Sequence, residues 1–177
     1  MIRLVIAQPC DLDVLTPLAN TPAARDALGF GLEELRPDDV AVILSRAVPG
    51  TTTRTWSIIA GERIVGCISL SNMNPIQRCG EITNRLVEEA AGWMIGLQAV
   101  EQVAAIGFRE LNLWRIECTI HGDNRASLLL CDRLARRGLR KEGIRRKAVW
   151  REGQWHDSHL YAILREDYKE GHELPAS

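Results

Sequence analysis

The sequence predicts a mixed α/β (α+β) fold in one domain, with about seven strands and about four helices. At 177 residues the chain is long enough for one domain with a core and short for two. Apolar residues alternate with polar ones in some segments and recur every three or four residues in others, which are the periods of strands and helices. The chain has no internal repeat and no low-complexity tract, so the elements belong to a single globular unit.

The first part of the chain predicts one strand and two helices. Residues 3–8 read as a strand, and the acidic pair Asp11 and Asp13 caps a helix with leucines on one face. Pro37, followed by two aspartates, is a strong start for a second helix, because proline and acidic residues favour the first turn. That helix ends before Pro49.

The middle of the chain predicts three strands. Residues 55–60 and 63–70 are apolar runs on either side of Gly61 and Glu62, a pattern typical of a β-hairpin. Residues 81–87 form the next strand after a long loop.

The second half predicts two helices and three strands. Residues 94–111 give the clearest helix, with an apolar stripe opposite a polar face. Residues 115–121 alternate as a half-buried strand, and a fourth helix follows from Asn124. Residues 139–165 read as two strands around a turn at Gly153.

The composition excludes several classes of protein. Charged residues make up 25% and hydrophobic residues 46%, and the net charge of −1 provides no overall field for nucleic acid or a membrane. No apolar run approaches the roughly 18 residues of a membrane-spanning helix, and no signal peptide is visible. We therefore expect a cytoplasmic protein with one domain over residues 1–170 and a loose tail over 171–177.

The cysteines are odd in number and scattered, without a C-x-x-C spacing. Such a set predicts reduced thiols and argues against a zinc site or a disulfide framework. We expect no metal. The five are Cys10, Cys67, Cys79, Cys118 and Cys131.

Three segments carry chemical signals. Glycines occur between the strand at 81–87 and the following helix, where free backbone N–H groups suit a pyrophosphate; a structural turn explains the same pattern. Asn124 and Ser127 lie three apart at a helix start, where capping is the alternative explanation. The stretch from Gly153 to Tyr161 carries a histidine, and alone it looks like a hairpin turn.

In this order, the segments resemble the GNAT superfamily of N-acetyltransferases, and within it the ribosomal-protein N-terminal acetyltransferases of the Rim type. The likeness covers nearly the whole chain and needs no gap between Glu81 and Ser127. It implies a central, mostly antiparallel twisted sheet, with a parallel splay between the fourth and fifth strands. The stretches that carry the likeness are 65–70, 81–82, 113–117, 124–127, 140–143 and 153–157.

The resemblance implies that acetyl-CoA is the co-substrate and lies in this splay. Backbone groups of Leu86 and Val87 would pair with the pantetheine arm, and Asn124 would hydrogen-bond it. The pyrophosphate would be held by the six residues Ala91, Gly92, Trp93, Met94, Ile95 and Gly96.

This phosphate loop departs from the family pattern Arg/Gln-x-x-Gly-x-Gly/Ala. Ala91 stands where a basic or amide residue is usual, and Met94 replaces the first glycine of the motif. The departure leaves an alternative open, namely a CoA-binding or protein-interaction module that has lost catalysis.

The resemblance also implies the reaction, transfer of an acetyl group to an amine. Glu81 is the favoured general base because it heads the strand beside the thioester, and Ser127 is the favoured acid because it matches a position near the thioester sulfur. An exposed strand carboxylate and a helix cap are the structural alternatives for these two residues. His121, His156 and Tyr161 are further acid–base candidates.

The predicted partner is an amine substrate, either a peptide N-terminus or a small molecule. Arg85 stands where members of this group tend to carry an aromatic residue, and the difference favours an acidic substrate or acyl group. A basic cluster at residues 133–151 reads as a solvated face, a contact for CoA phosphates or an acidic substrate, or a contact with ribosomal RNA near a protein target. Otherwise we expect no nucleic acid and no membrane partner, and a homodimer is left open.

Overall fold

The computed structural model describes residues 1–21, 34–45, 52–87, 93–151 and 153–169. The α-helices there are α1 (Leu12–Ala19), α3 (Pro37–Ser45), α4 (Trp93–Arg109) and α5 (Arg125–Leu134), with short 3-10 turns at Pro9–Asp11 and Ala135–Arg137. The strands are β1 (Ile2–Ile6), β2 (Thr52–Ala60), β3 (Arg63–Asn74), β4 (Cys79–Leu86), β5 (Arg115–His121), β6 (Arg140–Arg151) and β7 (Gln154–Leu164).

These seven strands form one sheet in the order β1-β2-β3-β4-β5-β7-β6. Every neighbouring pair is antiparallel except β4 and β5, which are parallel. The predicted mixed α/β fold is therefore confirmed, including the single parallel pair between the fourth and fifth strands. The expected tail at 171–177 lies outside the described residues.

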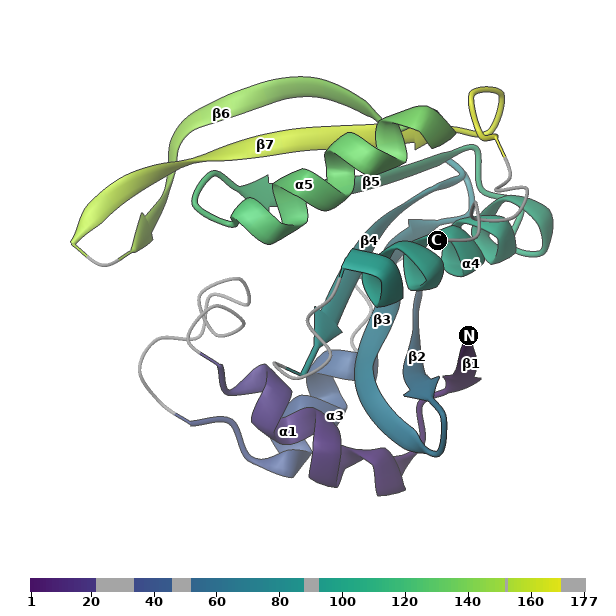
Figure 1. Ribbon diagram of the computed structural model, residues 1–177, viewed down its shortest axis with the longest axis vertical. Helices are drawn as coiled ribbons and strands as arrows, with labels where there is room; N and C mark the ends of the chain where they lie inside the picture. Colours follow the sequence, from purple (N-terminus) through teal and green to yellow (C-terminus); the bar gives the residue numbers. More distant parts are fainter. Residues whose placement is uncertain (22–33, 46–51, 88–92, 152, 170–177) are drawn as a thin grey trace.

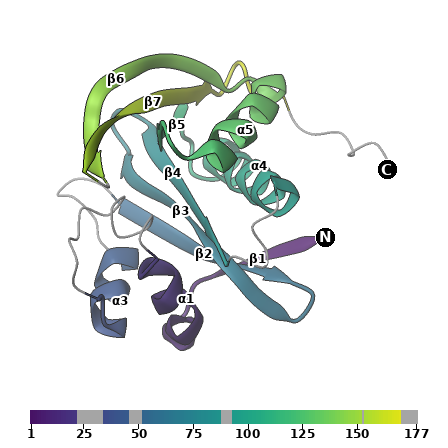
Figure 2. The same ribbon diagram turned by 60° about the vertical axis from the view of Figure 1, so that its left-hand side comes forward.

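The helices cover the two faces of the sheet separately, α4 and α5 on one and α1 with α3 on the other (Figures 1 and 2). Two adjacent residues of β3 show which helices pack on each face, because successive side chains of a strand point to opposite faces. Ile68 is completely buried in the main core with Val103 and Phe108 of α4. Cys67 packs instead with Leu15 and Leu18 of α1.

Strands β4 and β5 part soon after they meet. Their ladder contains the pairs Cys79↔Arg115, Gly80↔Ile116 and Glu81↔Glu117, after which β4 runs on beside β3 and β5 beside β7 (Figure 1). Each strand is held by its antiparallel neighbour, up to Gly66↔Leu86 on one side and His121↔Ser158 on the other. We call the space between β4 and β5 beyond Glu81 the splay.

Gly66 allows β3 and β4 to stay close along the splay. A Cβ atom at this position would lie 2.2 Å from the carbonyl oxygen of Arg85, a distance that no side chain tolerates. The glycine in the predicted hairpin strand is therefore required by backbone packing rather than by a turn.

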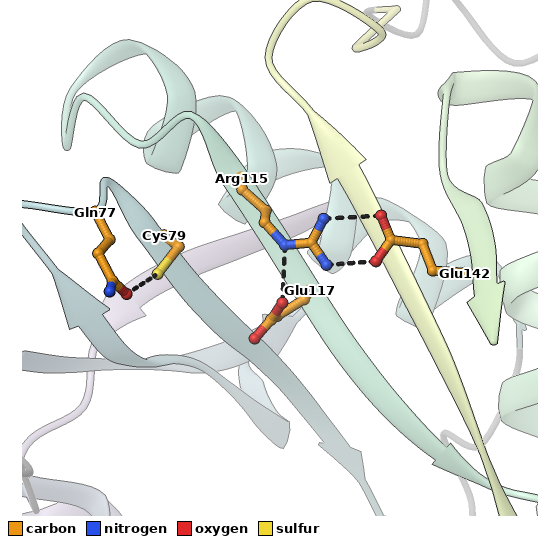
Figure 3. Close-up of polar contacts among 5 residues, drawn as sticks. All are labelled: Gln77, Cys79, Arg115, Glu117 and Glu142. Atoms are coloured by element: carbon orange, nitrogen blue, oxygen red, sulfur yellow. Dashed lines mark hydrogen bonds and ion pairs between the residues drawn. The ribbon is translucent and has the colours of Figure 1, made fainter. Parts of the chain in front are cut away.

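An ion-pair network fixes β5 to the far edge of the sheet. The Arg115 guanidinium donates two hydrogen bonds to the Glu142 carboxylate, at 2.8 and 2.5 Å, and its Nε donates to Glu117 at 2.9 Å (Figure 3). Since β7 lies between β5 and β6, this pair bridges three strands. Paired hydrogen bonds of this kind are among the stronger polar contacts in proteins.

Some element boundaries differ from those predicted. Strand β1 ends at Ile6, two residues early, and β3 continues to Asn74, four residues beyond the prediction. Asp11 does not cap α1 with its side chain; its carboxylate accepts from the Gln8 amide at 2.9 Å and from the Ser57 hydroxyl at 2.6 Å. A tertiary contact to β2 thus takes the place of the local cap. No described helix is long and apolar enough to cross a bilayer.

Candidate active site

A cavity of about 460 Å³ occupies the splay. Its walls are residues 82–86 of β4 and 116–121 of β5, and its lining includes Asn124 and Ser127 at the start of α5. On the opposite face of the sheet it reaches Leu18 of α1. The cavity therefore connects the α4–α5 face with the α1 face at the place where the sheet opens.

The structure brings Leu86, Asn124 and Ser127 together around this cavity. The Val87 amide is already bonded to the Val65 carbonyl at 2.9 Å, on the β3 side. Backbone groups alternate in direction along an antiparallel strand, so the N–H and C=O of Leu86 face the splay. Leu86 is thus better placed than Val87 to pair with a ligand there.

Asn124 is the N-cap of α5. Its Oδ1 accepts a hydrogen bond from the backbone N–H of Ser127 at 3.0 Å, which is the capping interaction raised as the alternative from the sequence. This bond does not use the amide Nδ2 of Asn124, which remains a possible donor for a ligand in the cavity that Asn124 lines. The cap uses the backbone of Ser127 and not its side chain, so capping does not account for the Ser127 hydroxyl.

The predicted phosphate loop is partly helical. Ala91 and Gly92 lie outside the described residues, and Trp93 opens α4. Met94 and Ile95 are half-buried in the first turn.

Gly96 is buried where α4 meets β4 and α5. A Cβ atom there would lie 3.2 Å from Nδ2 of Asn84 and 3.3 Å from Cδ2 of Leu130, which is tighter than ordinary contact. Gly96 therefore lets the helix pack closely against the wall of the cavity.

Asn84 is a cavity residue that sequence reasoning missed. Its Oδ1 is buried and has no hydrogen-bond partner among the described residues. A buried acceptor without a donor is unfavourable by about 1–3 kcal/mol, so this oxygen favours a ligand that carries an N–H group. The pantetheine arm of CoA carries amide N–H groups, so Asn84 fits this ligand. An asparagine between Ile82 and Leu86, in the apolar phase of its strand, was the available signal.

Glu81 lies at the edge of the cavity, next to the lining residue Ile82. Partial burial raises the pKa of its carboxyl above the ordinary range. A hydrogen bond from the Asn72 amide at 3.4 Å opposes the rise, and the negative charge of Glu117 adds to it. A carboxylate in this environment binds a proton more readily than a solvated one.

The other acid–base candidates differ in their position relative to the cavity. His121 lines the cavity, whereas His156 does not. Tyr161 is 8% exposed on β7 opposite Cys118, and burial raises its pKa.

Two of the cysteines lie at the site. Cys118 and Cys131 both line the cavity, and the neighbouring Cys131 thiol, followed by burial, raises the pKa of Cys118. All five cysteines are free thiols. Within the described ranges, no cluster of three His, Cys, Asp or Glu side chains is arranged to hold a metal ion.

Comparison with solved structures gives the same fold. The spermidine N-acetyltransferase of Vibrio cholerae, solved in complex with CoA and spermine, superposes with a TM-score of 0.80 at 19% identity; the match covers 94% of this chain and 97% of that one. A chimera of that enzyme, SpeG, and hSSAT gives a TM-score of 0.78 at 18% identity, over 94% and 97% of the two chains. At such identities the likeness concerns the fold.

Comparison by sequence assigns the family. No curated protein matches the chain significantly. The family profile described as "Acetyltransferase (GNAT) domain" matches residues 2–135, which is most of the chain and includes the whole of α4, β5 and α5. The protein therefore belongs to the GNAT family and is an N-acetyltransferase.

Proposed function

We propose that this protein transfers an acetyl group from acetyl-CoA to a primary amine, either a peptide N-terminus or a small-molecule amine. The observation that carries the proposal is the cavity in the splay, which Asn84, Leu86, Asn124 and Ser127 line and beside which Glu81 lies. It combines unused polar groups for a ligand with a carboxylate that has a raised affinity for protons.

Four groups are proposed to hold CoA. The backbone of Leu86 pairs with the pantetheine arm as an added strand would, since β5 has moved away at that point. Asn84 accepts a hydrogen bond from this arm through its free Oδ1, and Asn124 donates one through Nδ2. Backbone N–H groups at the start of α4 receive the pyrophosphate, because a helix N-terminus favours negative charge.

Two side chains are proposed to move protons. Bound acetyl-CoA would supply the acetyl group as an activated thioester. Glu81 takes the proton of the attacking amine, directly or through water, which its raised pKa favours. Ser127 protonates the departing thiolate, since the residue lines the cavity and the helix cap uses only its backbone. Correct placement of the amine supplies much of the remaining acceleration.

The sequence supports two further parts of the proposal, the class of acceptor and the cellular location. The resemblance to Rim-type enzymes supports a peptide N-terminus as acceptor, and the composition supports a cytoplasmic location in one domain over residues 1–170. The Vibrio cholerae enzyme was solved with spermine, a polyamine, so small amines belong in any panel of acceptors.

One observation favours a second candidate, a CoA-binding module without catalysis. Met94 stands in the first turn of α4, and Ala91 offers no side-chain donor in the predicted phosphate loop. A longer side chain there narrows the approach to the helix N-terminus, and weaker CoA binding would follow.

Calorimetric titration followed by product analysis tests both candidates. We expect CoA and acetyl-CoA to bind, and mass spectrometry to detect a gain of one acetyl group in a panel of peptides and small amines. Asn84→Leu should weaken CoA binding because it removes the free acceptor, whereas the exposed-site change Arg63→Gln should not. Binding without any acetylated product would favour the module, and no binding at millimolar ligand would contradict both.

A further inference from the structure

We propose that Arg85 binds a carboxylate group of the acceptor, so that the substrate is an amine whose carboxylate lies several bonds from the amino group. This specificity rests on the proposed N-acetyltransferase function and concerns the same cavity. An acidic peptide N-terminus and a long ω-amino acid both have this chemistry.

Among the charged residues that line the cavity, Arg85 differs from the others in its ion-pair partners. The other two charged residues in the lining are Glu117 and Arg151. Glu117 accepts from Arg115 at 2.9 Å, and Arg151 donates to Asp123 at 3.0 Å. Arg85 is half-buried and has no carboxylate partner in the part of the chain that the structure describes. Arg85 is therefore the cation in the cavity lining that has no ion-pair partner among the described residues.

The protein neighbour that Arg85 does have is neutral. Arg85 pairs across the β3–β4 ladder with Cys67, whose thiol is 3% exposed. Burial raises the pKa of this thiol, and the guanidinium opposes that rise only in part, so the thiol carries no charge at neutral pH. A partly desolvated guanidinium beside a neutral group favours an anionic ligand, and its planar donors suit a carboxylate.

The direction of the strand assigns this anion to the acceptor rather than to CoA. Side chains alternate along β4, so Arg85 and Glu81 share one face while Asn84 and Leu86 share the other. Asn84 lies against Gly96 of α4, on the side of the proposed CoA contacts. Arg85 lies beside Cys67, on the side where α1 packs, and the face of Glu81, the proposed base, is the one that the acceptor approaches.

The spacing of these two residues defines the substrate further. Glu81 and Arg85 are four residues apart, which corresponds to about 13 Å of extended strand. An acceptor with its amine beside Glu81 and its carboxylate beside Arg85 therefore needs several bonds between the two groups. A polyamine would instead place a second cation beside the guanidinium, which is unfavourable.

Three acceptors with the same number of carbons, six, test the proposal: ε-aminocaproate, hexylamine and hexamethylenediamine. They end in a carboxylate, a methyl group and an ammonium group. We expect kcat/KM for ε-aminocaproate to exceed that for hexylamine by about 10- to 100-fold, mainly through KM, as one charge-assisted contact would give. The diamine should be the poorest of the three.

Variants of Arg85 assign the preference to this side chain. Arg85→Gln should raise KM for ε-aminocaproate and leave hexylamine unchanged, and Arg85→Lys should keep part of the preference. Arg63→Gln, an exposed arginine on β3, makes the same charge change and should have no effect. Equal loss for both acceptors in Arg85→Gln would overturn the proposal, as would wild-type use of hexylamine as efficiently as ε-aminocaproate.

A binding measurement gives an answer independent of turnover. Calorimetry with hexanoate and hexanol, in the presence of saturating CoA, should show tighter binding of hexanoate to the wild type and no difference in Arg85→Gln. No such difference in the wild type would overturn the proposal. A preference for succinyl-CoA over acetyl-CoA that Arg85→Gln abolishes would also overturn it, because Arg85 would then contact the acyl group. Failure of the proposed function itself is distinct: no acceptor in any panel would be acetylated.

Discussion

Glu81 on β4 stands opposite Glu117 on β5 in the final registered pair before the two strands part. The two carboxylates differ in their partners. Glu117 accepts a 2.9 Å hydrogen bond from Arg115, whereas Glu81 receives a 3.4 Å bond from the Asn72 amide. With partial burial, and with the charge of Glu117 nearby, the pKa of Glu81 is raised. One carboxylate of the pair is therefore bound to an arginine, and the other has a raised affinity for a proton.

Replacing Glu81 tests the proposed base. Because its pKa is raised, the wild-type carboxylate loses its proton at a higher pH than a solvated one, and wild-type turnover should fall as pH drops through that pKa. Glu81→Gln should lower turnover at neutral pH by about 10²–10⁴-fold, with partial recovery at alkaline pH, where the amine is already neutral. A pH–rate profile measures this, with exposed Glu62→Gln as the control. A loss below about tenfold would count against the assignment.

Replacing Ser127 tests the proposed acid. Ser127→Ala should lower turnover at every pH, since expulsion of the thiolate is affected whatever the charge of the amine, by about 10²–10⁴-fold. Its stability should stay within about 0.5 kcal/mol of the wild type, because the cap of α5 uses the Ser127 backbone. Urea unfolding provides the stability check. Near-native turnover would make His121 and Tyr161 the next candidates.

Two substitutions separate the roles of Asn124. Asn124→Ala removes both the cap and the proposed CoA donor, so it should lower the free energy of unfolding by about 1 kcal/mol and weaken CoA binding. Asn124→Asp keeps a capping oxygen but has no amide N–H, so it should retain stability and still lose affinity. Unfolding and calorimetry on the same samples give both quantities. Wild-type affinity in Asn124→Asp would show that the residue only caps.

Replacing Gly96 or Gly107 of α4 with alanine should change the stability of the protein to different extents. A Cβ at Gly96 would meet Asn84 at 3.2 Å, and one at Gly107 would meet Ile116 at 2.7 Å. Alanine favours a helix over glycine by up to about 1 kcal/mol, but overpacking opposes this by about 1–3 kcal/mol. We expect Gly107→Ala to be the more destabilising in urea unfolding. Gly96→Ala should also reduce CoA affinity by displacing the Asn84 amide. The reverse order of stability would contradict this packing.

The Arg115–Glu142 pair predicts a pH-dependent contribution to stability. The Arg115 guanidinium lowers the pKa of Glu142, so the contribution is present above the ordinary glutamate pKa and is lost as pH falls through the lowered value. Because both side chains are partly exposed, Arg115→Gln should lower the free energy of unfolding by only about 1 kcal/mol at neutral pH. The difference should shrink in acid. A constant difference across pH would mean that packing, rather than charge, is lost.

Local patterns predicted most of the elements. The hairpin of β2 and β3, the apolar stripe of α4 and the alternation of β5 depend on residues a few positions apart, and β5 runs from Arg115 to His121 as its alternation indicated. Boundaries differ from the prediction where a partner strand determines the length, as for β3, which pairs with β2 as far as Met73 and with β4 as far as Asn74. Helix and strand periods are properties of neighbouring residues, so one sequence suffices to see them.

The residues around the cavity fall into two groups: those that the sequence identifies, and those whose role depends on the tertiary structure. Glu81, Leu86, Asn124 and Ser127 were named from motif order, which the sequence by itself determines. The unpartnered oxygen of Asn84 and the unbalanced charge of Arg85 were decided only by the tertiary structure. Whether a polar atom has a partner depends on segments far apart in the chain, and here on the parting of two parallel strands. A residue's type determines which hydrogen bonds and ion pairs it can make. Only the tertiary structure determines which of its groups have no protein partner and can bind a ligand.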